Sequence, residues 1–341
     1  MKKIFLCLFL FFVFLTSSFA QRDFRVMFYN VENLFDTKDN PKTNDDDFLP
    51  DGKQHWTNYR YWKKLKDISF VIDSVGKGYP PALIGLCEIE NDSVLFDLCK
   101  RSPLRKHKYN YIITHSKDDR GMNVALMYQR DEMKILKTME YTPRFEGQPN
   151  KYSRNILHVT GKIINGDTLD IFVCHFPSRS EGIKRSAPYR IDVAKLLKKK
   201  VDNLFYTRRK ANIIIMGDFN DYPNDISMKN VLEGKSVETK IHSRSLYNMF
   251  LHRTGKSDEG SYKYRGKWDF LDQFIVSGNL LNTKNKTNIR QNKAHIYYAD
   301  FLLENDLKYG DKKPFRTYSG YKYLEGISDH LPIYLNLNIV E

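Results

Sequence analysis

The strongest constraint on the fold is the apolar run Ile213-Ile214-Ile215-Met216, which is followed at once by Gly217-Asp218-Phe219-Asn220. An apolar run without alternation is typical of a strand covered on both faces, because a strand with one solvated face would alternate. Polar residues directly after such a strand emerge at the rim of the sheet. The ordinary alternative for this tetrapeptide is a turn in which Asp and Asn bond to nearby backbone.

Strand-like and helical segments are interspersed along the rest of the chain. Strands are predicted at residues 24–30, 82–87, 109–114, 123–128, 155–164, 168–174, 212–216, 270–276 and 331–337. Apolar positions at steps of three and four predict helices over residues 59–75 and 185–205. Strands dominate and most of them end in polar residues. This pattern favours two packed sheets with helices outside.

The first twenty residues have the features of a secretory signal peptide. Lys2 and Lys3 precede an apolar stretch over residues 4–15, and small residues lead to Ala20. An uncleaved anchor is the rival interpretation, but spanning a bilayer takes roughly 20 apolar residues. We expect cleavage after Ala20 and an exported protein, secreted or periplasmic, that begins at Gln21.

Cysteine usage and composition along the chain favour one ordinary packed domain over residues 21–341. Cys87, Cys99 and Cys174 remain after loss of the leader, and an odd count excludes a complete framework of internal disulfides. One bridge with one free thiol stays open. The middle of the chain contains no Gly/Ser-rich or Pro-rich linker and no internal repeat.

The charge of the chain is strongly basic. The formal net charge is +14, and removal of Lys2 and Lys3 with the leader lowers it by two. Such an excess favours polyanionic partners, such as nucleic acid or anionic surfaces, through counterion release and steering. A generally basic proteome is an alternative of nearly equal weight.

Polar residues with catalytic potential stand at the ends of six predicted strands. They are Asn30 and Glu32, Glu88, His175, Asp218 and Asn220, Asp272, and Asp329 with His330. Their order and spacing resemble the endonuclease/exonuclease/phosphatase superfamily, which includes deoxyribonuclease I, exonuclease III, sphingomyelinases and inositol polyphosphate 5-phosphatases. The resemblance spans residues 25–337, and Gly217–Asn220 and Ser328–Pro332 are its most specific parts.

The resemblance implies both a fold and an activity. The fold would be a four-layer α/β sandwich, in which two packed, mainly antiparallel sheets are flanked by helices. The activity would be hydrolysis of phosphate esters that depends on a divalent metal ion. Mg²⁺ is the expected ion, with Mn²⁺ or Ca²⁺ as alternatives, and such hard cations take oxygen ligands. Glu88 is the leading ligand, with Glu32 and Asn30 beside it and Asp329 sharing the ion.

The same resemblance gives roles to the remaining strand-end residues. Asp218 would orient or deprotonate the attacking water, and Asn220 would hold that water or a phosphate oxygen. His330 would stabilise the charge that builds on phosphorus, with Asp272 fixing its tautomer and charge. His175 would stabilise the phosphate or protonate the leaving oxygen. Each of these residues, taken alone, has an ordinary structural alternative such as a turn or a hydrogen-bonded core histidine.

Substrate contacts are expected from two places in the sequence. Arg120, Asn123 and Arg179 fall near the regions where the family contacts its substrates. The segment 312–323 interleaves basic residues with aromatic ones, including Tyr318, and such a segment can stack bases and contact phosphates. It can equally be a packed loop rich in tyrosine.

Three classes of function remain at this point. The leading interpretation is an exported, metal-dependent phosphodiesterase that acts as a nuclease. The nearest rival uses the same machinery on phospholipids or small phosphate esters, since one fold hosts several substrates. A non-catalytic binding protein ranks last, because a pure binder has no chemical need for both Asp218 and His330. The sequence leaves open DNA against RNA, endo against exo cleavage, the number of ions and the oligomeric state.

Overall fold

The computed structural model describes residues 24–255 and 258–340. The predicted leader, residues 1–20, lies outside the described residues. Within them the longer helices are α1 (Asn58–Gly76), α2 (Asp92–Phe96) and α3 (Ile183–Thr207). Short 3₁₀ turns occur at Asp46–Phe48, Pro103–His107, Leu251–Arg253, Gly278–Leu281 and Asp300–Leu302, and π turns at Asp97–Arg101 and Ile226–Val231.

The first large sheet has six strands in the order β14-β19-β1-β2-β4-β3. Its members are β1 (Phe24–Leu34), β2 (Leu83–Ile89), β3 (Asn110–Ile113), β4 (Asn123–Tyr128), β14 (Thr287–Ile296) and β19 (Ile333–Ile339). β1 and β2 run parallel, and the other neighbours in this sheet are antiparallel.

The second large sheet has seven strands in the order β5-β6-β7-β8-β13-β10-β9. They are β5 (Met133–Tyr141), β6 (Ile156–Ile163), β7 (Thr168–His175), β8 (Ile213–Asp218), β9 (Lys235–Ser236), β10 (Leu246–Asn248) and β13 (Asp272–Ser277). Three small antiparallel pairs complete the strands: β11 (Tyr262–Tyr264) with β12 (Lys267–Asp269), β15 (Leu303–Asn305) with β16 (Lys312–Pro314), and β17 (Tyr318–Ser319) with β18 (Lys322–Tyr323).

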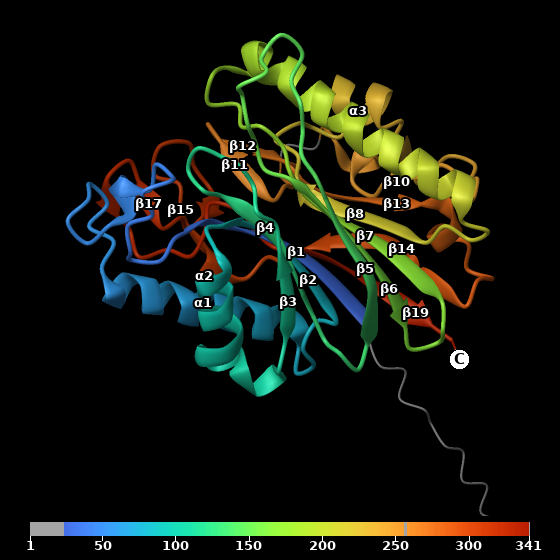
Figure 1. The fold of residues 1–341 in the computed structure, drawn as a ribbon, viewed down its shortest axis with the longest axis horizontal. Helices are drawn as coiled ribbons and strands as arrows, with labels where there is room; N and C mark the ends of the chain where they lie inside the picture. The colour runs from blue at the N-terminus through green and yellow to red at the C-terminus, as the bar shows by residue number, and fades with distance from the viewer. Residues whose placement is uncertain (1–23, 256–257, 341) are drawn as a thin grey trace, which may run out of the picture.

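Helices cover the outer faces of the two sheets (Figure 1). α1 is capped by the side chain of Thr57, which accepts from the backbone N–H of Arg60, and it buries one apolar stripe. α3 lies on the other side of the molecule, over β8 and its neighbours, and buries a second stripe. The order of layers is therefore helix, sheet, sheet, helix, and the four-layer sandwich with mainly antiparallel sheets is confirmed.

The two sheets pack face to face across a hydrophobic core. β2 carries Gly85 in this core, where an added Cβ would lie 2.8 Å from Cε of Met216 in the other sheet and 3.1 Å from Phe28. Every residue of Ile213–Asp218 is buried, as the run without alternation predicts for a strand with two covered faces. This packing fixes the carboxyl end of β8 at the rim between the sheets.

The three cysteines that follow the leader are buried free thiols. Cys87, Cys99 and Cys174 form no disulfide, so the single bridge that the sequence left open is not formed among them. Across residues 24–255 and 258–340, none of the helices combines the length and the apolar character that crossing a bilayer requires.

Candidate active site

Five strand ends and one loop bring the predicted residues to a single rim. Asp218 lies directly opposite His175 of β7 and opposite Asp272 of β13, because the three strands are neighbours in register. β1 and β2 bulge where they reach the same rim, and the bulge turns the side chain of Glu88 toward it. The loop before β19 adds His330.

The close packing of β8 against β7 explains why a glycine, Gly217, precedes Asp218. β8 runs so close to β7 that a Cβ at Gly217 would clash with the carbonyl oxygen of Cys174. Any larger residue would push the two strands apart and displace Asp218 from His175. The tetrapeptide is therefore part of a tightly packed strand end, and not only an ordinary turn.

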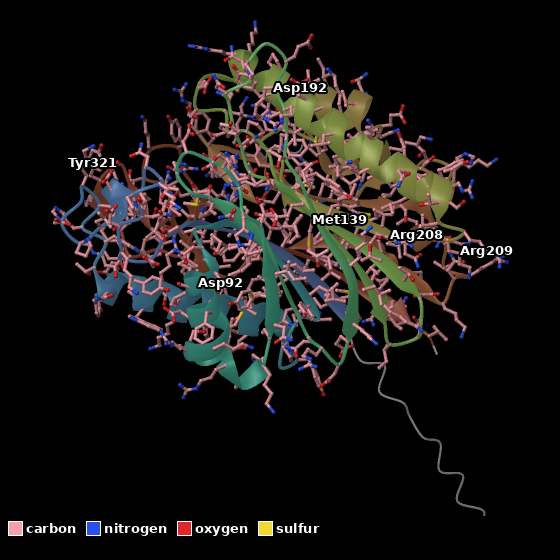
Figure 2. The ribbon with its side chains drawn as sticks, in the orientation of Figure 1. Asp92, Met139, Asp192, Arg208, Arg209 and Tyr321 are labelled. Atoms are coloured by element: carbon pink, nitrogen blue, oxygen red, sulfur yellow. The ribbon has the colours of Figure 1, made fainter. Side chains whose placement is uncertain are left out.

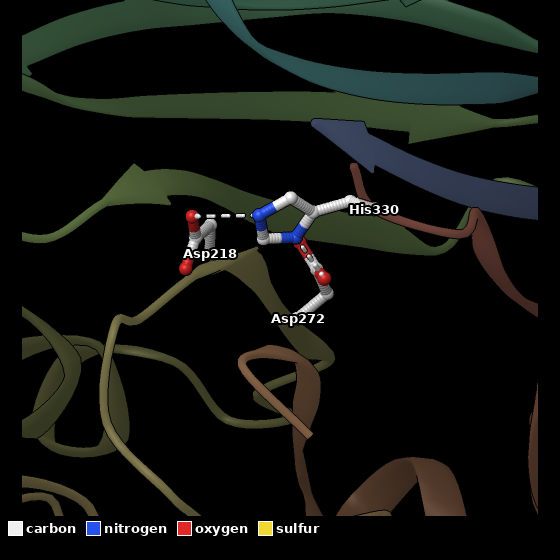
Figure 3. Close-up of side chains that lie close together, drawn as sticks. All are labelled: Asp218, Asp272 and His330. Carbon is white, nitrogen blue, oxygen red and sulfur yellow. Dashed lines mark hydrogen bonds and ion pairs between the residues drawn. The ribbon is translucent and has the colours of Figure 1, made fainter. Parts of the chain in front are cut away.

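His330 and Asp272 form a buried pair. Nδ1 of His330 lies 2.7 Å from Oδ2 of Asp272, and the side chains are almost wholly buried. Burial by itself would lower the pKa of His330, but the carboxylates of Asp272, Asp218 and Asp329 raise it well above the ordinary value. The three carboxylates therefore favour the protonated form of His330, and Figure 3 shows His330 between Asp218 and Asp272.

Asp218 lies at the centre of the site. Its Oδ2 is 3.9 Å from Nε2 of His330, 3.6 Å from Nε2 of His175 and 3.1 Å from Nδ2 of Asn30. Its Oδ1 accepts from the backbone N–H of Asn220 at 2.9 Å. Burial raises the pKa of Asp218 to about 6, against the opposing effect of the charge on His330. A carboxylate with a raised pKa is a better proton acceptor than an exposed one.

The pKa of His175 is shifted in the opposite direction from that of His330. Burial, and then the positive charges of Arg154, Arg120 and His330, lower the pKa of His175 well below its ordinary value. Its Nε2 lies 3.9 Å from Oε1 of Glu88. The environments of the two imidazoles thus shift their pKa values in opposite directions, and such a separation is the arrangement that divides acid and base roles.

The site contains three further carboxylates, those of Glu32, Glu88 and Asp329. Glu88 accepts from the backbone N–H of Asn33 at 2.7 Å, and Glu32 accepts from the backbone N–H of Thr317 at 2.8 Å. Asp329 pairs with Arg316 at 3.0 Å. Together with the two histidines, Asp218 and Arg120, these carboxylates line a cavity of about 590 Å³.

Comparisons with known proteins agree with this geometry. The sequence model described as "Endonuclease/Exonuclease/phosphatase family" matches residues 25–339. The chain belongs to this family. The search of curated proteins gave no significant match.

Several solved structures share the fold at low sequence identity. A family member from Bacteroides thetaiotaomicron has a TM-score of 0.56 at 15% identity, over 94% of this chain and 99% of that one. D. rerio TDP2 complexed with a single-strand DNA product has a TM-score of 0.56 at 16% identity, over 93% and 99%. B. thetaiotaomicron mannosyl-6-phosphatase has a TM-score of 0.54 at 16% identity, over 92% and 99%.

The family's divalent cation fits the acidic side of the cavity. Burial, and then the charge of Asp329, raise the pKa of Glu32 to about 7, and a bound cation would favour its charged form. Glu32, Glu88 and Asp329 all line the cavity and offer the hard oxygen donors that Mg²⁺ prefers. Asn30, the other predicted ligand, accepts at Oδ1 from the backbone N–H of Glu32. Its Nδ2 donates to Glu88 at 3.3 Å and to Asp218 at 3.1 Å, so Asn30 also positions these two carboxylates.

A second group of potential ligand atoms comes from Asp218, Asp272 and His330, which lie within 4.8 Å of one another. Within this group, Nδ1 of His330 is already hydrogen-bonded to Asp272, and a protonated imidazole repels a cation. We therefore favour Glu32, Glu88 and Asp329 as the ligands of the cation.

The structure separates the predicted substrate contacts into two sets. Arg120 and Arg179 line the cavity, and the guanidinium of Arg179 lies 4.1 Å from the ring centre of Tyr222. Asn123 does not line the cavity: it is buried, and its side chain donates to the carbonyl of Glu90 at 2.7 Å.

Tyr318 does not line the cavity either. It is 6% exposed, packs against Trp56 with ring centres 6.1 Å apart, and donates to the carbonyl of Gln54. The segment 312–323 is thus partly the packed loop that the sequence left as an alternative. Tyr321 of the same segment projects from the edge of the molecule (Figure 2).

The sequence analysis missed the aromatic wall of the cavity. Tyr222, Tyr262 and Tyr264 line it, and the ring of Tyr262 lies 4.8 Å from that of His330. The alternation Tyr-Lys-Tyr before Arg265-Gly266 is a hairpin signal that would have placed two of these rings on one face.

Proposed function

We propose that this protein is an exported phosphodiesterase that requires a divalent metal ion and hydrolyses nucleic-acid phosphodiester bonds with an activated water. The observation that carries the proposal is the placement of Asp218 beside the pair of His330 and Asp272, in a cavity that Glu32, Glu88 and Asp329 also line. The leader sequence, residues 1–20, supports export.

The residues of the site divide the reaction between them. Asp218 accepts the proton of the attacking water, for which a pKa of about 6 is suitable at neutral pH. Asn220, whose amide is held by the carbonyl of Phe176 at 3.1 Å, orients that water. The His330 imidazolium stabilises the negative charge that grows on the phosphoryl oxygens, and Asp272 keeps it protonated and oriented.

His175 and the acidic residues serve the other parts of the reaction. Neutral His175 donates a hydrogen bond from Nε2 to the phosphate or to the leaving oxygen. Glu88, Glu32 and Asp329 would hold the divalent cation. When bound, that cation would neutralise charge on a phosphoryl oxygen and orient the ester.

Nucleic acid is favoured as the substrate by the charges and rings around the carboxylates. Arg120 and Arg179 would supply phosphate contacts at the cavity, the half-buried ring of Tyr262 lies beside His330, and the exposed ring of Tyr264 also lines the cavity. The basic net charge of the chain also favours a polyanionic substrate. The single-strand DNA product in the TDP2 structure supports this substrate class by analogy of fold.

A small phosphate ester or a phospholipid is the second candidate. The mannosyl-6-phosphatase of B. thetaiotaomicron has the same fold, and its name supports a phosphosugar monoester as one member of this class. A substrate panel separates the candidates. Single-stranded and duplex DNA, RNA, sphingomyelin, mannose 6-phosphate and bis(p-nitrophenyl) phosphate are each incubated with the mature protein and Mg²⁺. We expect kcat/KM to be highest for a nucleic acid, and a higher value for the lipid or the sugar phosphate would refute the proposed substrate.

A further inference from the structure

A second cavity lies beside the active site. It has a volume of about 310 Å³ and shares Tyr262, Tyr264 and Asp329 with the active-site cavity. Five cationic side chains line it, namely Lys263, Arg265, Lys308, Lys313 and Arg316, against the two carboxylates of Asp306 and Asp329. The second cavity is therefore continuous with the catalytic centre and carries an excess of positive charge.

The hairpin β11–β12 connects the two cavities. It begins at Tyr262, which forms a β-bridge to His330, and residues two apart on a strand face the same side, so Tyr264 follows Tyr262 along one face. The turn is Arg265-Gly266, with φ of 48° and 83°. A Cβ at Gly266 would lie 3.0 Å from Cβ of Tyr309, so glycine lets the turn pack on Tyr309.

The cations of the second cavity fall into two kinds. Lys263, Lys313 and Arg316 are paired, with Asp306 at 3.6 Å, Glu304 at 3.5 Å and Asp329 at 3.0 Å. Arg265 and Lys308 have no ion-pair partner among residues 24–255 and 258–340, and both are exposed. Their charges are therefore available to an anion from solution.

Each unpaired cation stands over an exposed aromatic ring. The guanidinium of Arg265 lies 5.2 Å from the ring centre of Tyr264, and the ammonium of Lys308 lies 5.3 Å from that of Tyr309. These rings are 54% and 46% exposed. Exposed rings accept the face of an unpaired base, and cations beside them contact the phosphate that joins one base to the next.

We propose that the second cavity binds a nucleotide adjacent to the scissile phosphate of a single-stranded nucleic acid. Tyr264 and Tyr309 stack on unpaired bases, and Arg265 and Lys308 contact the phosphates of the strand. This inference rests on the proposed function and extends it, because it gives the enzyme a preference for unpaired strands over duplexes and over small esters.

Binding to a catalytically silent protein tests the inference directly. A fluorescent single-stranded 12-mer is titrated into the Asp218→Asn protein across a salt series. We expect Arg265→Ala/Lys308→Ala to weaken binding about tenfold at low salt and to reduce the salt slope by roughly 1.4, since each single-strand phosphate contact contributes about 0.7. We expect Tyr264→Ala/Tyr309→Ala to weaken binding at least about tenfold with the slope unchanged.

Matched variants control the experiment. Tyr264→Phe/Tyr309→Phe keeps both rings and should restore binding. Lys199→Ala removes an exposed cation from α3 and should change neither the affinity nor the slope. In the active enzyme, Arg265→Ala/Lys308→Ala should lower kcat/KM for the oligonucleotide at least about tenfold more than for bis(p-nitrophenyl) phosphate.

The outcomes separate this inference from the proposed function. Unchanged affinity and slope in both double variants, with oligonucleotide cleavage by the unmutated enzyme, would overturn the second-cavity site alone. Hydrolysis of a small ester without cleavage of any nucleic acid would refute the proposed function. Loss of binding to phosphatidylserine vesicles in the same variants, without binding of the oligonucleotide, would reassign the cavity to a lipid surface and overturn the inference.

Discussion

Oδ2 of Asp272 lies 2.7 Å from Nδ1 of His330, inside a buried pair contributed by the start of β13 and the loop before β19. The pair places a positive charge at Nε2 of His330, the ring nitrogen that faces Asp218. The strength of this charge depends on Asp272, because burial alone would lower the pKa of the imidazole.

Asp272→Asn should therefore reduce kcat at least about 100-fold, since it removes the carboxylate that keeps His330 charged at the transition state. The measurement is turnover of a nucleic-acid substrate at pH 7, with the melting temperature recorded for each protein. Asp300→Asn, which changes a carboxylate that is 92% exposed, is the matched control. Near-normal turnover of Asp272→Asn with an intact fold would show that His330 works without this partner.

Asp218→Asn and His330→Ala should each lower kcat by roughly 100-fold or more, the scale of lost proton transfer or lost charge stabilisation. The double variant should lose little more than either single variant, because the two residues act in one step. Steady-state kinetics of the three proteins check this. Additive losses in the double variant would indicate that Asp218 and His330 serve separate steps.

Removal of divalent metal should abolish turnover, and Glu88→Gln should raise the Mg²⁺ concentration for half-maximal activity about tenfold or more, because a neutral amide replaces a charged oxygen ligand. Activity is measured in a Mg²⁺ titration after chelation. Glu325→Gln, at an exposed carboxylate, should leave the titration unchanged. Full activity in metal-free protein would exclude the assigned cation.

A stability prediction concerns Asp170, which is buried away from the active site. It accepts from Thr160 at 2.6 Å, from His158 at 3.1 Å and from Arg208 at the end of α3, a residue labelled in Figure 2. Burial alone would raise the pKa of Asp170, but these hydrogen bonds hold it below its usual value. Its stabilising effect is therefore complete above the unfolded pKa of about 3.9 and is lost as pH falls through the folded value.

Asp170→Asn should lower the free energy of unfolding by about 3 kcal/mol at pH 7, the cost of breaking a buried pair. The difference from the unmutated protein should shrink as the pH falls below about 4. Urea denaturation at pH 7 and pH 3 gives both values, with the exposed Asp202→Asn as control. A difference of the same size at both pH values would contradict this account of Asp170.

The sequence predicts the central strands because burial on both faces leaves an uninterrupted apolar run, as at Ile213–Met216. It does not predict β5 or β14, which lie at the sheet ends. β5 is mostly exposed, and β14 carries polar residues around a bulge between Ile289 and Ala294. Edge strands lack the continuous apolar signal, so their presence depends on neighbours far away in the chain.

The site shows the same division. Asp218 and His330 lie next to strands with buried apolar residues, so the local sequence is enough to predict them as site residues. Tyr318 has a local sequence as suggestive as theirs, yet it packs on Trp56, more than 250 residues earlier in the chain. Local composition does not distinguish an exposed ring from a packed one. Tyr264 and Tyr309 are brought together only by the tertiary fold, and so the second cavity is not visible in the sequence.

The central claim is that this site hydrolyses a nucleic-acid phosphodiester bond with Asp218 and a divalent cation. It is tested most directly by cleavage of an end-labelled single-stranded oligonucleotide in excess enzyme. The account predicts rapid product formation by the mature protein with Mg²⁺, and at least about a 100-fold slower reaction both after chelation and in Asp218→Asn. Equal cleavage rates in the three reactions, or no cleavage by the unmutated protein with Mg²⁺, would contradict it.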